Sequence, residues 1–451
     1  MNDTICSIAT SLGVGAISII RISGNEAIQI VNKVFKGKNL NDVQTHTIHY
    51  GHIYYNEEII DEVLVSVMRS PKTYTTEDIV EINLHGGIAT TNKVLEILLL
   101  NGCRMAEPGE FTKRRFLNGR IDLIQAEAVS DLINSENDKA RKVAINGLKG
   151  STSNLIKDLR KDLINIISNI EVNIDYPEYE DIYEVTLNDL KEKISDIKEK
   201  LINIIKDYED GKIITDGIKT AIIGRPNVGK SSLLNRLLQE EKAIVTDIPG
   251  TTRDIVEGSV LINGIKLNII DTAGIRETDD VVEKIGVKKS LDVINDANLI
   301  LLLLNNNEKL DKEDLELLEI TKNKTTIVVV NKNDLESNLD LTNFELENIV
   351  YINTIDDLGI NVLKDKIREI FNLEKLEKNE FNYITNARQI AKIRECLEIV
   401  FDIEKGISNN LDLDILEIDL KNIWDTLGYI VGESYSEELL DELFSKFCVG
   451  K

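Results

Sequence analysis

The stretch IKTAIIGRPNVGKS, residues 218–231, decides the fold of the central part of the chain. Its first six residues are mostly apolar and predict a buried strand. The remainder has the pattern G-x-x-x-x-G-K-[ST], in which glycines let successive backbone N–H groups surround a phosphate. Lys230 would place a cation on the β- and γ-phosphates, and Ser231 would supply an oxygen ligand to Mg²⁺. The stretch therefore predicts a phosphate-binding loop between a strand and a helix.

A second motif, Asp271-Thr272-Ala273-Gly274, follows a predicted strand at 266–270. Asn263-Gly264 joins that strand to its predecessor, which is a strong signal for a β-hairpin. Asp271 can hold Mg²⁺ through a water, and the N–H of Gly274 can donate to the γ-phosphate. The motif thus predicts a second set of contacts to the metal and to the terminal phosphate.

The third motif, Asn331-Lys332-Asn333-Asp334, ends a predicted strand at 326–330. An aspartate there can accept hydrogen bonds from N1–H and the 2-amino group of guanine, and adenine offers neither. The order and spacing of the three motifs resemble those of the translation-factor-like GTPases. Chance occurrence of three turn-forming strings, each after its own strand, is the weaker interpretation. Residues 216–378 are therefore predicted to form a Ras-like P-loop GTPase (G) domain.

The residue after the second motif constrains the mechanism. It is Ile275, where Ras-like GTPases carry a glutamine that orients the attacking water. An alkyl side chain cannot form a hydrogen bond with water, so the catalytic group must come from elsewhere. Arg253 and Arg276 are nearby candidates for an arginine finger, and the stretch 279–283 offers carboxylates.

The segments that flank the insert have different patterns. Residues 1–120 indicate a mixed α/β domain, with a helix expected at 90–100 and strands at 17–22, 46–55, 59–68 and 78–84. Beyond residue 120 the apolar residues recur at helical spacing, and Pro177 separates two helices. Insertion of the G domain into a helical domain explains why apolar residues recur at helical spacing again after residue 378. The predicted fold class is therefore multidomain α/β, with an N-terminal α/β domain at 1–120, a discontinuous helical domain at 121–215 plus 379–451, and the G domain at 216–378.

Composition narrows the class of protein. The 451 residues are 42% hydrophobic and 29% charged, which excludes global disorder. Lys and Arg total 53 against 78 Asp and Glu, so a general nucleic-acid coat is disfavoured. Residues 1–120 contain 12 basic and 13 acidic side chains, so the excess of negative charge lies almost wholly in residues 121–451. Without a disulfide framework, a signal peptide or an apolar run of membrane-spanning length, the predicted location is the cytoplasm.

Several longer motifs extend the pattern over the whole chain. They are GRPNVGKSS at 224–232, TDIPGTTRD at 246–254, DTAGIRE at 271–277, FCVGK at 447–451, EPGEFTKR from Glu107 and DLIQAEA from Asp122. Together they resemble the bacterial TrmE/MnmE family of tRNA uridine-modification GTPases. The resemblance implies an enzyme that hydrolyses GTP to GDP and phosphate.

The resemblance also implies the residues that contact the nucleotide. Ser231 and Thr252 match the two Mg²⁺ ligands. The full implied set for GTP is Asn227, Val228, Gly229, Lys230, Ser231, Ser232, Thr246, Asp247, Ile248, Pro249, Gly250, Thr251, Thr252, Asp271, Thr272, Ala273, Gly274, Asn331, Lys332 and Asp334.

Family members hydrolyse GTP when two G domains dimerise around K⁺. Asn227 matches the asparagine that binds this ion, and backbone oxygens complete the implied cage at Thr246, Ile248 and Thr251. A monovalent cation there can neutralise developing phosphate charge as an arginine finger does. Glu283 matches the glutamate that orients water through a bridge, in agreement with the absence of a glutamine at position 275. On the residues alone, Asn227 would more often be a variable loop residue and Glu283 a solvated one.

The N-terminal domain of the family resembles folate-dependent one-carbon enzymes and dimerises. Its contacts to 5-formyl- or 5,10-methylene-tetrahydrofolate map to Arg21, Glu81 and Arg120, with Lys451 reaching in from the C-terminus. Without the resemblance these would be ordinary charges of strands and loops. The resemblance implies that the homodimer works on tRNA in a hetero-tetramer with an FAD- and NADH-dependent partner, MnmG/GidA. Together they install an aminomethyl or carboxymethylaminomethyl group at C5 of the wobble uridine (U34).

Some positions leave more than one interpretation open. The fifth guanine motif, usually Ser-Ala-x-x-Gly, reads NTIDDLG at 353–359, and Asn305 ends a strand where aspartate is common. Backbone N–H groups contact the base at the fifth motif, so we expect binding to persist. Cys448 is either a nucleophile or, more commonly, a small packed residue. A basic cluster either contacts tRNA phosphate or pairs with Glu107 and Glu110 on the surface, and it consists of Lys113, Arg114, Arg115 and Arg120.

Two other functions fit part of the sequence. A ribosome-assembly GTPase switch of the Era/Der type binds RNA without modifying it. Such proteins usually carry a basic RNA-binding appendage, whereas the flanks here are acidic and helical. A folate aminomethyl transferase with a regulatory G domain would share the folate site, so only the nucleic-acid substrate separates it from the first interpretation.

Overall fold

The computed structural model describes residues 3–175, 186–240, 256–262, 264–270, 294–355, 359–373 and 384–451. The chain divides into two compact units. The first contains residues 1–133, 145–202 and 386–451, and the second contains residues 134–144 and 203–385. The three-domain division predicted with boundaries at residues 120, 215 and 378 stays a prediction.

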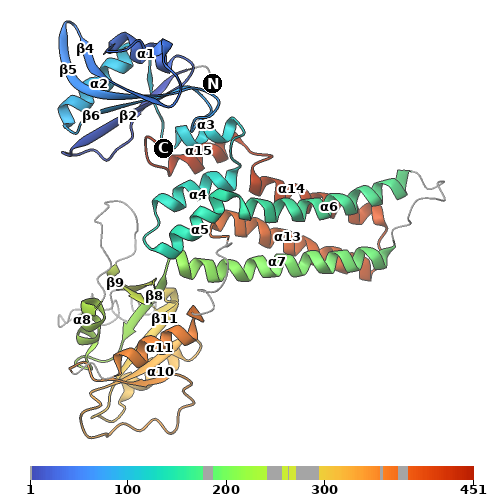
Figure 1. Ribbon diagram of the computed structural model, residues 1–451. Coiled ribbons are helices and arrows are strands. Elements are labelled where there is room, and N and C mark those ends of the chain that lie inside the picture. Colours follow the sequence, from blue (N-terminus) through green and yellow to red (C-terminus); the bar gives the residue numbers. More distant parts are fainter. Residues whose placement is uncertain are drawn as a thin grey trace, which may run out of the picture. The chain divides into compact units, whose positions relative to one another are not determined.

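A seven-stranded sheet forms the N-terminal part of the first unit (Figure 1). Its strand order is β3-β4-β5-β6-β2-β1-β7, with β1 pairing in parallel with β7 and antiparallel with β2. The strands predicted at 46–55 and 59–68 are confirmed as β4 and β5, which pair antiparallel up to Tyr55 and Glu58 and so form a hairpin. The strands are β1 (Ile5–Ile8), β2 (Ile17–Ser23), β3 (Phe35–Lys36), β4 (Thr47–Tyr55), β5 (Glu58–Met68), β6 (Ile79–His85) and β7 (Arg104–Met105).

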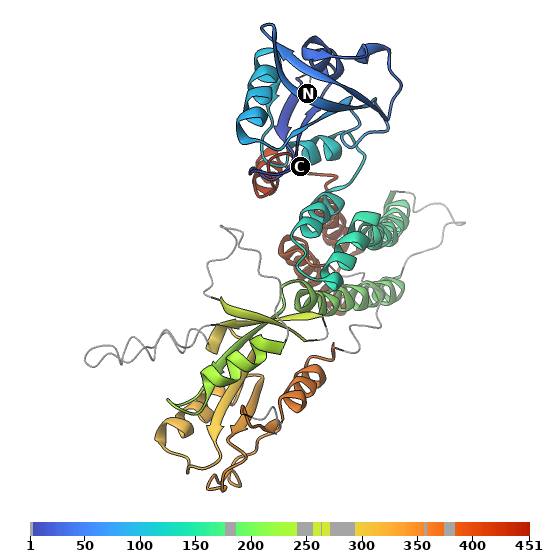
Figure 2. The ribbon, with the colours of Figure 1, turned by 60° about the vertical axis from the view of Figure 1, so that its left-hand side comes forward.

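Helices cover one face of this sheet (Figure 2, blue and light blue). α1 (Ala27–Val34) and α2 (Ile88–Leu100) share a hydrophobic core with strand residues such as Ile20, Val65 and Ile82. A short 3₁₀ helix, Leu40–Asp42, closes the same core with Leu40. The strand and helix predicted around residues 78–100 are confirmed.

The opposite face of the sheet is lined by the alternate residues of the same strands. Because successive strand residues point to opposite faces, Arg21 on β2 and its register partner Glu81 on β6 lie on this second face. The face also carries apolar side chains that are between 47% and 65% exposed: Ile17, Ile48, Tyr50 and Leu64. We refer to these four residues, with Arg21 and Glu81, as the open sheet face.

The remaining elements of the first unit are helices. Figure 1 shows α6, α13 and α14 running side by side, and α14 packs against both of the others. The two helices predicted on either side of Pro177 are confirmed, and Pro177 itself lies outside the described residues. Residues of α5 (Asp138–Lys149) and α7 (Leu187–Thr215) belong to both units. The other helices are α3 (Glu110–Leu117), α4 (Leu123–Ile133), α6 (Ser151–Asp175), α13 (Ala387–Ser408), α14 (Leu413–Val431) and α15 (Glu437–Ser445).

The second unit contains a six-stranded sheet of order β13-β12-β11-β8-β10-β9. All its pairings are parallel except that of β9 with β10, which confirms the predicted hairpin. Its strands are β8 (Ile218–Ile223), β9 (Val256–Ile262), β10 (Ile265–Ile270), β11 (Leu299–Asn305), β12 (Thr326–Asn331) and β13 (Ile349–Tyr351).

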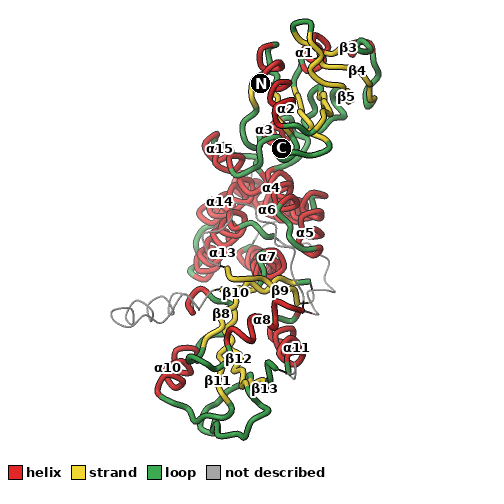
Figure 3. Tube along the Cα trace, turned by 90° about the vertical axis from the view of Figure 1, so that its left-hand side faces the viewer, coloured by secondary structure: helices red, strands yellow, loops and turns green. Residues whose placement is uncertain are grey.

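Both faces of this second sheet are covered, as expected for parallel strands. Figure 3 shows the strands between α10 (Lys312–Thr321) on one side and α8 (Lys230–Glu240) with α11 (Ile360–Ile370) on the other. Every residue of β11 is buried, and its leucines alternate between the two cores. In such open sheets, ligands bind at the carboxyl ends of the strands. The phosphate loop after β8 and the third motif after β12 both lie at that end.

Within the described residues, no helix combines the length and the apolar character that a membrane span requires.

Candidate functional site

The phosphate loop connects β8 to α8, which confirms the predicted strand–loop–helix order. At two positions of this loop only glycine fits, because the backbone has a positive φ and a Cβ atom would collide with neighbouring atoms. Gly224 has a φ of 146°, and a Cβ there would lie 2.5 Å from the carbonyl oxygen of Leu303 on β11. Gly229 has a φ of 103°, and a Cβ there would lie 2.2 Å from Asn331 Nδ2. The loop therefore packs so closely on the sheet that larger side chains would displace it.

Lys230 begins α8 and folds back along the loop. Its Nζ donates to the carbonyl oxygens of Gly224 at 2.6 Å and Arg225 at 2.7 Å. Burial lowers the pKa of Lys230, because desolvation disfavours the ammonium. Ser231 and Ser232 follow in the first turn of the helix, where free N–H groups and the helix dipole favour anions. The arrangement fits the phosphates of a nucleotide.

The third motif is joined directly to the phosphate loop. Asn331, at the end of β12, is 1% exposed and donates from Nδ2 to the carbonyl oxygen of Val228 at 2.8 Å. Its Oδ1 has no hydrogen-bond partner in the part of the chain that the structure describes. Lys332 adopts a positive φ of 62°, and its carbonyl oxygen accepts from the N–H of Leu335 at 3.0 Å. The buried asparagine thus connects the predicted base-recognition turn to the phosphate loop.

The altered fifth motif lies beside this turn. The N–H of Asn333 donates to the carbonyl oxygen of Ile352 at 3.3 Å. The next residue, Asn353, is 2% exposed and accepts from the N–H of Ile355 at 2.9 Å. The asparagine side chain therefore holds the start of the segment where backbone N–H groups are predicted to contact the base.

The structure brings together the predicted nucleotide contacts at 227–232 and 331–334. Asn227 is exposed on the loop with a φ of 64°. The other predicted contacts lie outside the described residues, and they are Thr246 to Thr252, Asp271 to Gly274 and Glu283, together with Ile275, Arg253 and Arg276. Their roles stay predictions.

A second group of predicted residues meets on the open sheet face. Arg21 Nε lies 2.8 Å from Glu81 Oε1, and Arg21 Nη1 donates to the carbonyl oxygen of Gly450 at 3.2 Å. The carbonyl oxygen of Lys451 accepts from the N–H of Phe111 at 3.1 Å. The C-terminal segment therefore contacts the predicted folate residue Arg21, which is far away in sequence and is itself paired with Glu81.

Arg120 is not part of that group. It is exposed and donates to the carbonyl oxygen of Pro71 at 3.4 Å, without a hydrogen bond or ion pair to Arg21, Glu81 or Lys451 in the described residues. Its predicted folate contact stays a prediction.

The same region contains aromatic residues that the sequence reasoning missed. The guanidinium of Arg21 lies 5.8 Å from the ring centres of both Tyr74 and Phe111. The guanidinium of Arg115 lies 4.7 Å from the ring centre of Tyr74. These are cation–π distances. No local sequence pattern predicts these contacts, because the arginines and the aromatic residues come from separate segments of the chain.

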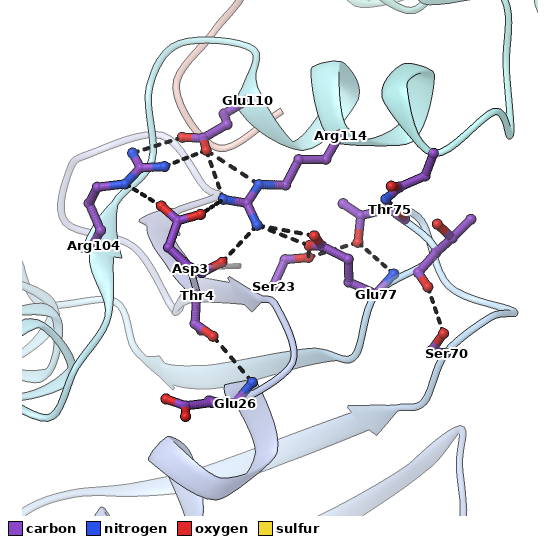
Figure 4. A network of polar contacts seen from close by, with 12 residues as sticks. Asp3, Thr4, Ser23, Glu26, Ser70, Thr75, Glu77, Arg104, Glu110 and Arg114 are labelled. Carbon is purple, nitrogen blue, oxygen red and sulfur yellow. Dashed lines mark hydrogen bonds and ion pairs between the residues drawn. The ribbon is translucent and has the colours of Figure 1, made fainter. Parts of the chain in front are cut away.

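The predicted basic cluster at 113–120 does not form one surface. Arg114 is 1% exposed and forms ion pairs with Glu110 at 2.9 Å, Glu77 at 3.1 Å and Asp3 at 2.8 Å (Figure 4). Arg104 also pairs with Glu110 at 2.6 Å. The interpretation that Arg114 binds tRNA phosphate is therefore wrong for this residue, because its side chain is buried and its donors are engaged by Asp3, Glu77 and Glu110. We refer to these five residues as the Arg114 network.

Two family models match the chain. The model of the MnmE helical domain matches residues 123–448, and the model of the GTP-binding protein TrmE N-terminus matches residues 4–120. Between them they match most of the chain.

Curated relatives match from end to end. A protein of Streptococcus thermophilus is 52% identical over 451 residues, which is 100% of this chain and 98% of the relative. A protein of Streptococcus mutans is 51% identical, with 100% and 99% covered. A protein of Bacillus licheniformis is 50% identical over 458 residues, with 100% of both covered. All three are named tRNA modification GTPase MnmE.

A solved structure matches a part of the chain. The structure of Era in complex with MgGDPNP and nucleotides 1506–1542 of 16S ribosomal RNA is 31% identical, over 34% of this chain and 56% of Era, with a TM-score of 0.27. The curated relatives, in contrast, match the whole chain, so a ribosome-assembly switch is not favoured. With both family models and these relatives in agreement, the chain belongs to the MnmE family.

Proposed function

We propose that this chain is a K⁺-activated GTPase that modifies the wobble uridine of certain tRNAs together with an FAD-dependent partner. The proposal is carried by the end-to-end likeness to proteins named tRNA modification GTPase MnmE. The geometry of the insert supports it, because Lys230 and Asn331 both contact the phosphate loop. The product would carry an aminomethyl or carboxymethylaminomethyl group at C5 of U34.

GTP hydrolysis is the chemical step of the G domain. Loop N–H groups and Lys230 bind the β- and γ-phosphates, while Asp334 accepts hydrogen bonds from guanine. Ser231 and Thr252 would hold Mg²⁺, which neutralises phosphate charge. Glu283 would orient the attacking water, which the alkyl side chain of Ile275 cannot do. Attack on the γ-phosphate then yields GDP and phosphate.

The K⁺ part of the proposal centres on Asn227. This side chain is exposed at the rim of the loop, so it is accessible to a cation. Its implied partners are the backbone oxygens of Thr246, Ile248 and Thr251. A cation held there would supply positive charge to the phosphoryl oxygens, where charge develops in the transition state.

Asn227→Ala provides the test of this part. We expect GTP turnover by the unaltered protein to be at least about 10-fold faster in K⁺ than in Na⁺, as for the gain or loss of one preorganised charge. Asn227→Ala should remove this difference, measured as phosphate release at equal ionic strength. Asn338→Ala is the matched control, because Asn338 donates to the carbonyl oxygen of Asn307. Equal rates of the unaltered protein in both salts would contradict the cation cage.

The open sheet face supports the proposed homodimer and folate site. Its exposed apolar residues are the kind of surface that a second copy of the chain covers. Arg21 and Glu81 lie on the same face, beside the C-terminal segment. A carboxylate such as Glu81 can accept from the amino-pterin ring of a tetrahydrofolate, and Arg21 and Lys451 can bind its carboxylates.

Mass spectrometry of tRNA nucleosides tests the proposed function itself. In a strain that lacks this chain, we expect the C5 substituent of the wobble uridine to disappear from the affected tRNAs. Expression of the full chain should restore it. Expression of Asn338→Ala serves as a positive control for a folded variant. If wobble uridines were unaltered in the deletion strain, the modification proposal would be refuted, whereas GTP hydrolysis by the purified chain would still stand.

A further inference from the structure

Arg225, the second residue of the phosphate loop, is held by three carboxylates. Its Nε lies 2.9 Å from Asp314, its Nη1 lies 2.9 Å from Asp311 Oδ2, and its Nη2 lies 3.0 Å from Glu308 Oε2. All three nitrogens of the guanidinium are therefore engaged. The side chain of Arg225 is only 16% exposed, so these ion pairs are partly shielded from water.

The three carboxylates are themselves fixed by the start of α10. Asp311 caps this helix, because its side chain accepts from the N–H of Glu313 at 2.7 Å. The side chain of Asp314 in turn accepts from the N–H of Asp311 at 3.2 Å. Asp314 is 2% exposed. The reciprocal pair is a capping box, which orients both carboxylates before Arg225 binds them.

Glu308 is fixed from the sheet. Its Oε1 accepts from Asn305 Nδ2 at 2.5 Å, and Asn305 is the last residue of β11. Asn305 also accepts from the N–H of Asn307 at 3.1 Å. Asn305, which stands at a strand end where aspartate is common, thus positions one of the three carboxylates. We refer to Glu308, Asp311 and Asp314 as the carboxylate anchor.

The backbone of Arg225 faces the other way. Its carbonyl oxygen accepts a hydrogen bond from Lys230 Nζ at 2.7 Å, and the neighbouring carbonyl oxygen of Gly224 accepts from the same Nζ. The side chain thus ties the loop to α10 while the carbonyl group positions the lysine that binds phosphate. Because the guanidinium is neutralised by the anchor, its charge is not directed at a bound nucleotide.

We propose that Arg225 is a positioning residue that holds the empty phosphate loop in its nucleotide-binding conformation by tying it to the carboxylate anchor. Without the tie, the nucleotide itself must order the loop. The apparent dissociation constant then rises by the inverse of the fraction of loops that are already in the binding conformation. The inference rests on GTP binding by the G domain, and it is independent of the proposed K⁺, folate and tRNA chemistry.

The first test uses the full chain and a fluorescent GDP analogue as the probe. We expect Arg225→Met to weaken GDP binding by about 10-fold, as for a loop that is in the binding conformation a tenth of the time. The turnover number at saturating GTP should change by less than about 2-fold while KM rises, because a lost ordering step affects binding and not chemistry. Arg225→Lys should recover part of the affinity. Unchanged GDP affinity in Arg225→Met would overturn the proposal.

Arg368→Met is the matched control. Arg368 pairs with Asp365 at 2.6 Å within α11, so the substitution removes the same type of contact in the same unit. GDP affinity should stay at the unaltered value in this variant. A comparable loss in both variants would show a general effect of arginine removal and would overturn the specific role of Arg225.

The anchor itself provides the decisive experiment. The double variant Glu308→Gln/Asp311→Asn keeps Asp314 and retains a capping side chain at position 311, because asparagine caps helices as well as aspartate. We expect it to weaken GDP binding, and its effect should be less than additive with that of Arg225→Met. If Arg225 were instead a phosphate ligand restrained by the anchor, removing these carboxylates would tighten GDP binding. Tighter binding would therefore overturn the proposal, even if Arg225→Met failed to fold.

Discussion

Lys230→Met is expected to lower the rate of GTP hydrolysis by about 10²–10³-fold, the usual loss when one preorganised donor to a charged transition state is removed. The Nζ of Lys230 lies within hydrogen-bonding distance of two loop carbonyl groups, so the ammonium is already placed in the loop. Methionine keeps a similar apolar stem and removes the charge. The transition state therefore loses positive charge while the loop keeps its packing.

Phosphate release at saturating GTP and K⁺ measures this effect. Lys366→Met is the control, because Lys366 pairs with Glu369 at 2.9 Å on α11 and has no predicted contact with nucleotide. The control should hydrolyse GTP at the unaltered rate. A rate within about 3-fold of the unaltered value in Lys230→Met would contradict the assignment, because it corresponds to less than 1 kcal/mol of transition-state binding.

Arg114→Met is expected to destabilise the first unit by about 3–5 kcal/mol, the cost of leaving buried charges without their partner. Arg114 is 1% exposed, and its partner Glu110 has a side chain that is 3% exposed. Arg104 remains bound to both Glu110 and Asp3 in the variant, but the ion pair between Arg114 and Glu77, whose side chain is 14% exposed, disappears. Figure 4 shows that these partners come from separate segments, so their loss should loosen the whole N-terminal part.

Urea unfolding at pH 7 tests this expectation. Arg141→Met serves as the control, because Arg141 is 48% exposed and pairs with Asp138 within α5. An exposed pair of this kind contributes less than about 1 kcal/mol. Equal unfolding free energies for the two variants would show that the Arg114 network is not a major source of stability.

The pH dependence of stability should follow from the same network. Burial alone would raise the pKa of Glu110, but hydrogen bonds from Arg104, the N–H of Glu107 and Arg114 outweigh it and hold the pKa below 4.5. The pKa of Asp3 is likewise held below 3.8, by Arg104 and Arg114 against the effect of burial. Carboxylates with a lowered pKa stabilise the folded state above their unfolded pKa and lose this contribution as the pH falls through the folded value.

The first unit should therefore lose stability below about pH 4.5, where the unfolded carboxylates begin to take up protons. The difference in unfolding free energy between the unaltered protein and Arg114→Met should become smaller over the same pH range. Protonation of the carboxylates removes from the unaltered protein the ion pairs that the substitution has already removed from the variant. Urea midpoints measured between pH 7 and pH 3 provide the comparison. A difference that stayed constant down to pH 3 would contradict the role of these ion pairs.

Much of the nucleotide site could be predicted because its signals are local. Gly224, with its φ of 146°, and Lys230, at the start of a helix, belong to one short motif, and Asn331 ends the strand that precedes its own motif. The strand, loop and helix around 218–240 therefore follow from short-range pattern and backbone geometry. The hairpins at 47–68 and 256–270 follow in the same way from alternation and turn residues.

Other parts of the sites depend on contacts that no local pattern contains. The sequence could not show that Arg114 is buried whereas Arg120 is exposed, because both lie in the same basic run. Nor could it show that Arg225 faces the start of α10, more than eighty residues away. The likeness to a family implied that Lys451 reaches the folate site from the C-terminus, but only the fold provides the contact of Arg21 with Gly450.

The sequence by itself determined the strand and helix on either side of the phosphate loop, the loop itself and the class of nucleotide, because turns, strand ends and helix starts are governed by neighbouring residues. Only the tertiary structure decided which arginines bind carboxylates inside the protein and which remain at the surface. The physical reason is that burial and ion pairing depend on the distance between segments in space, and separation along the chain does not specify that distance.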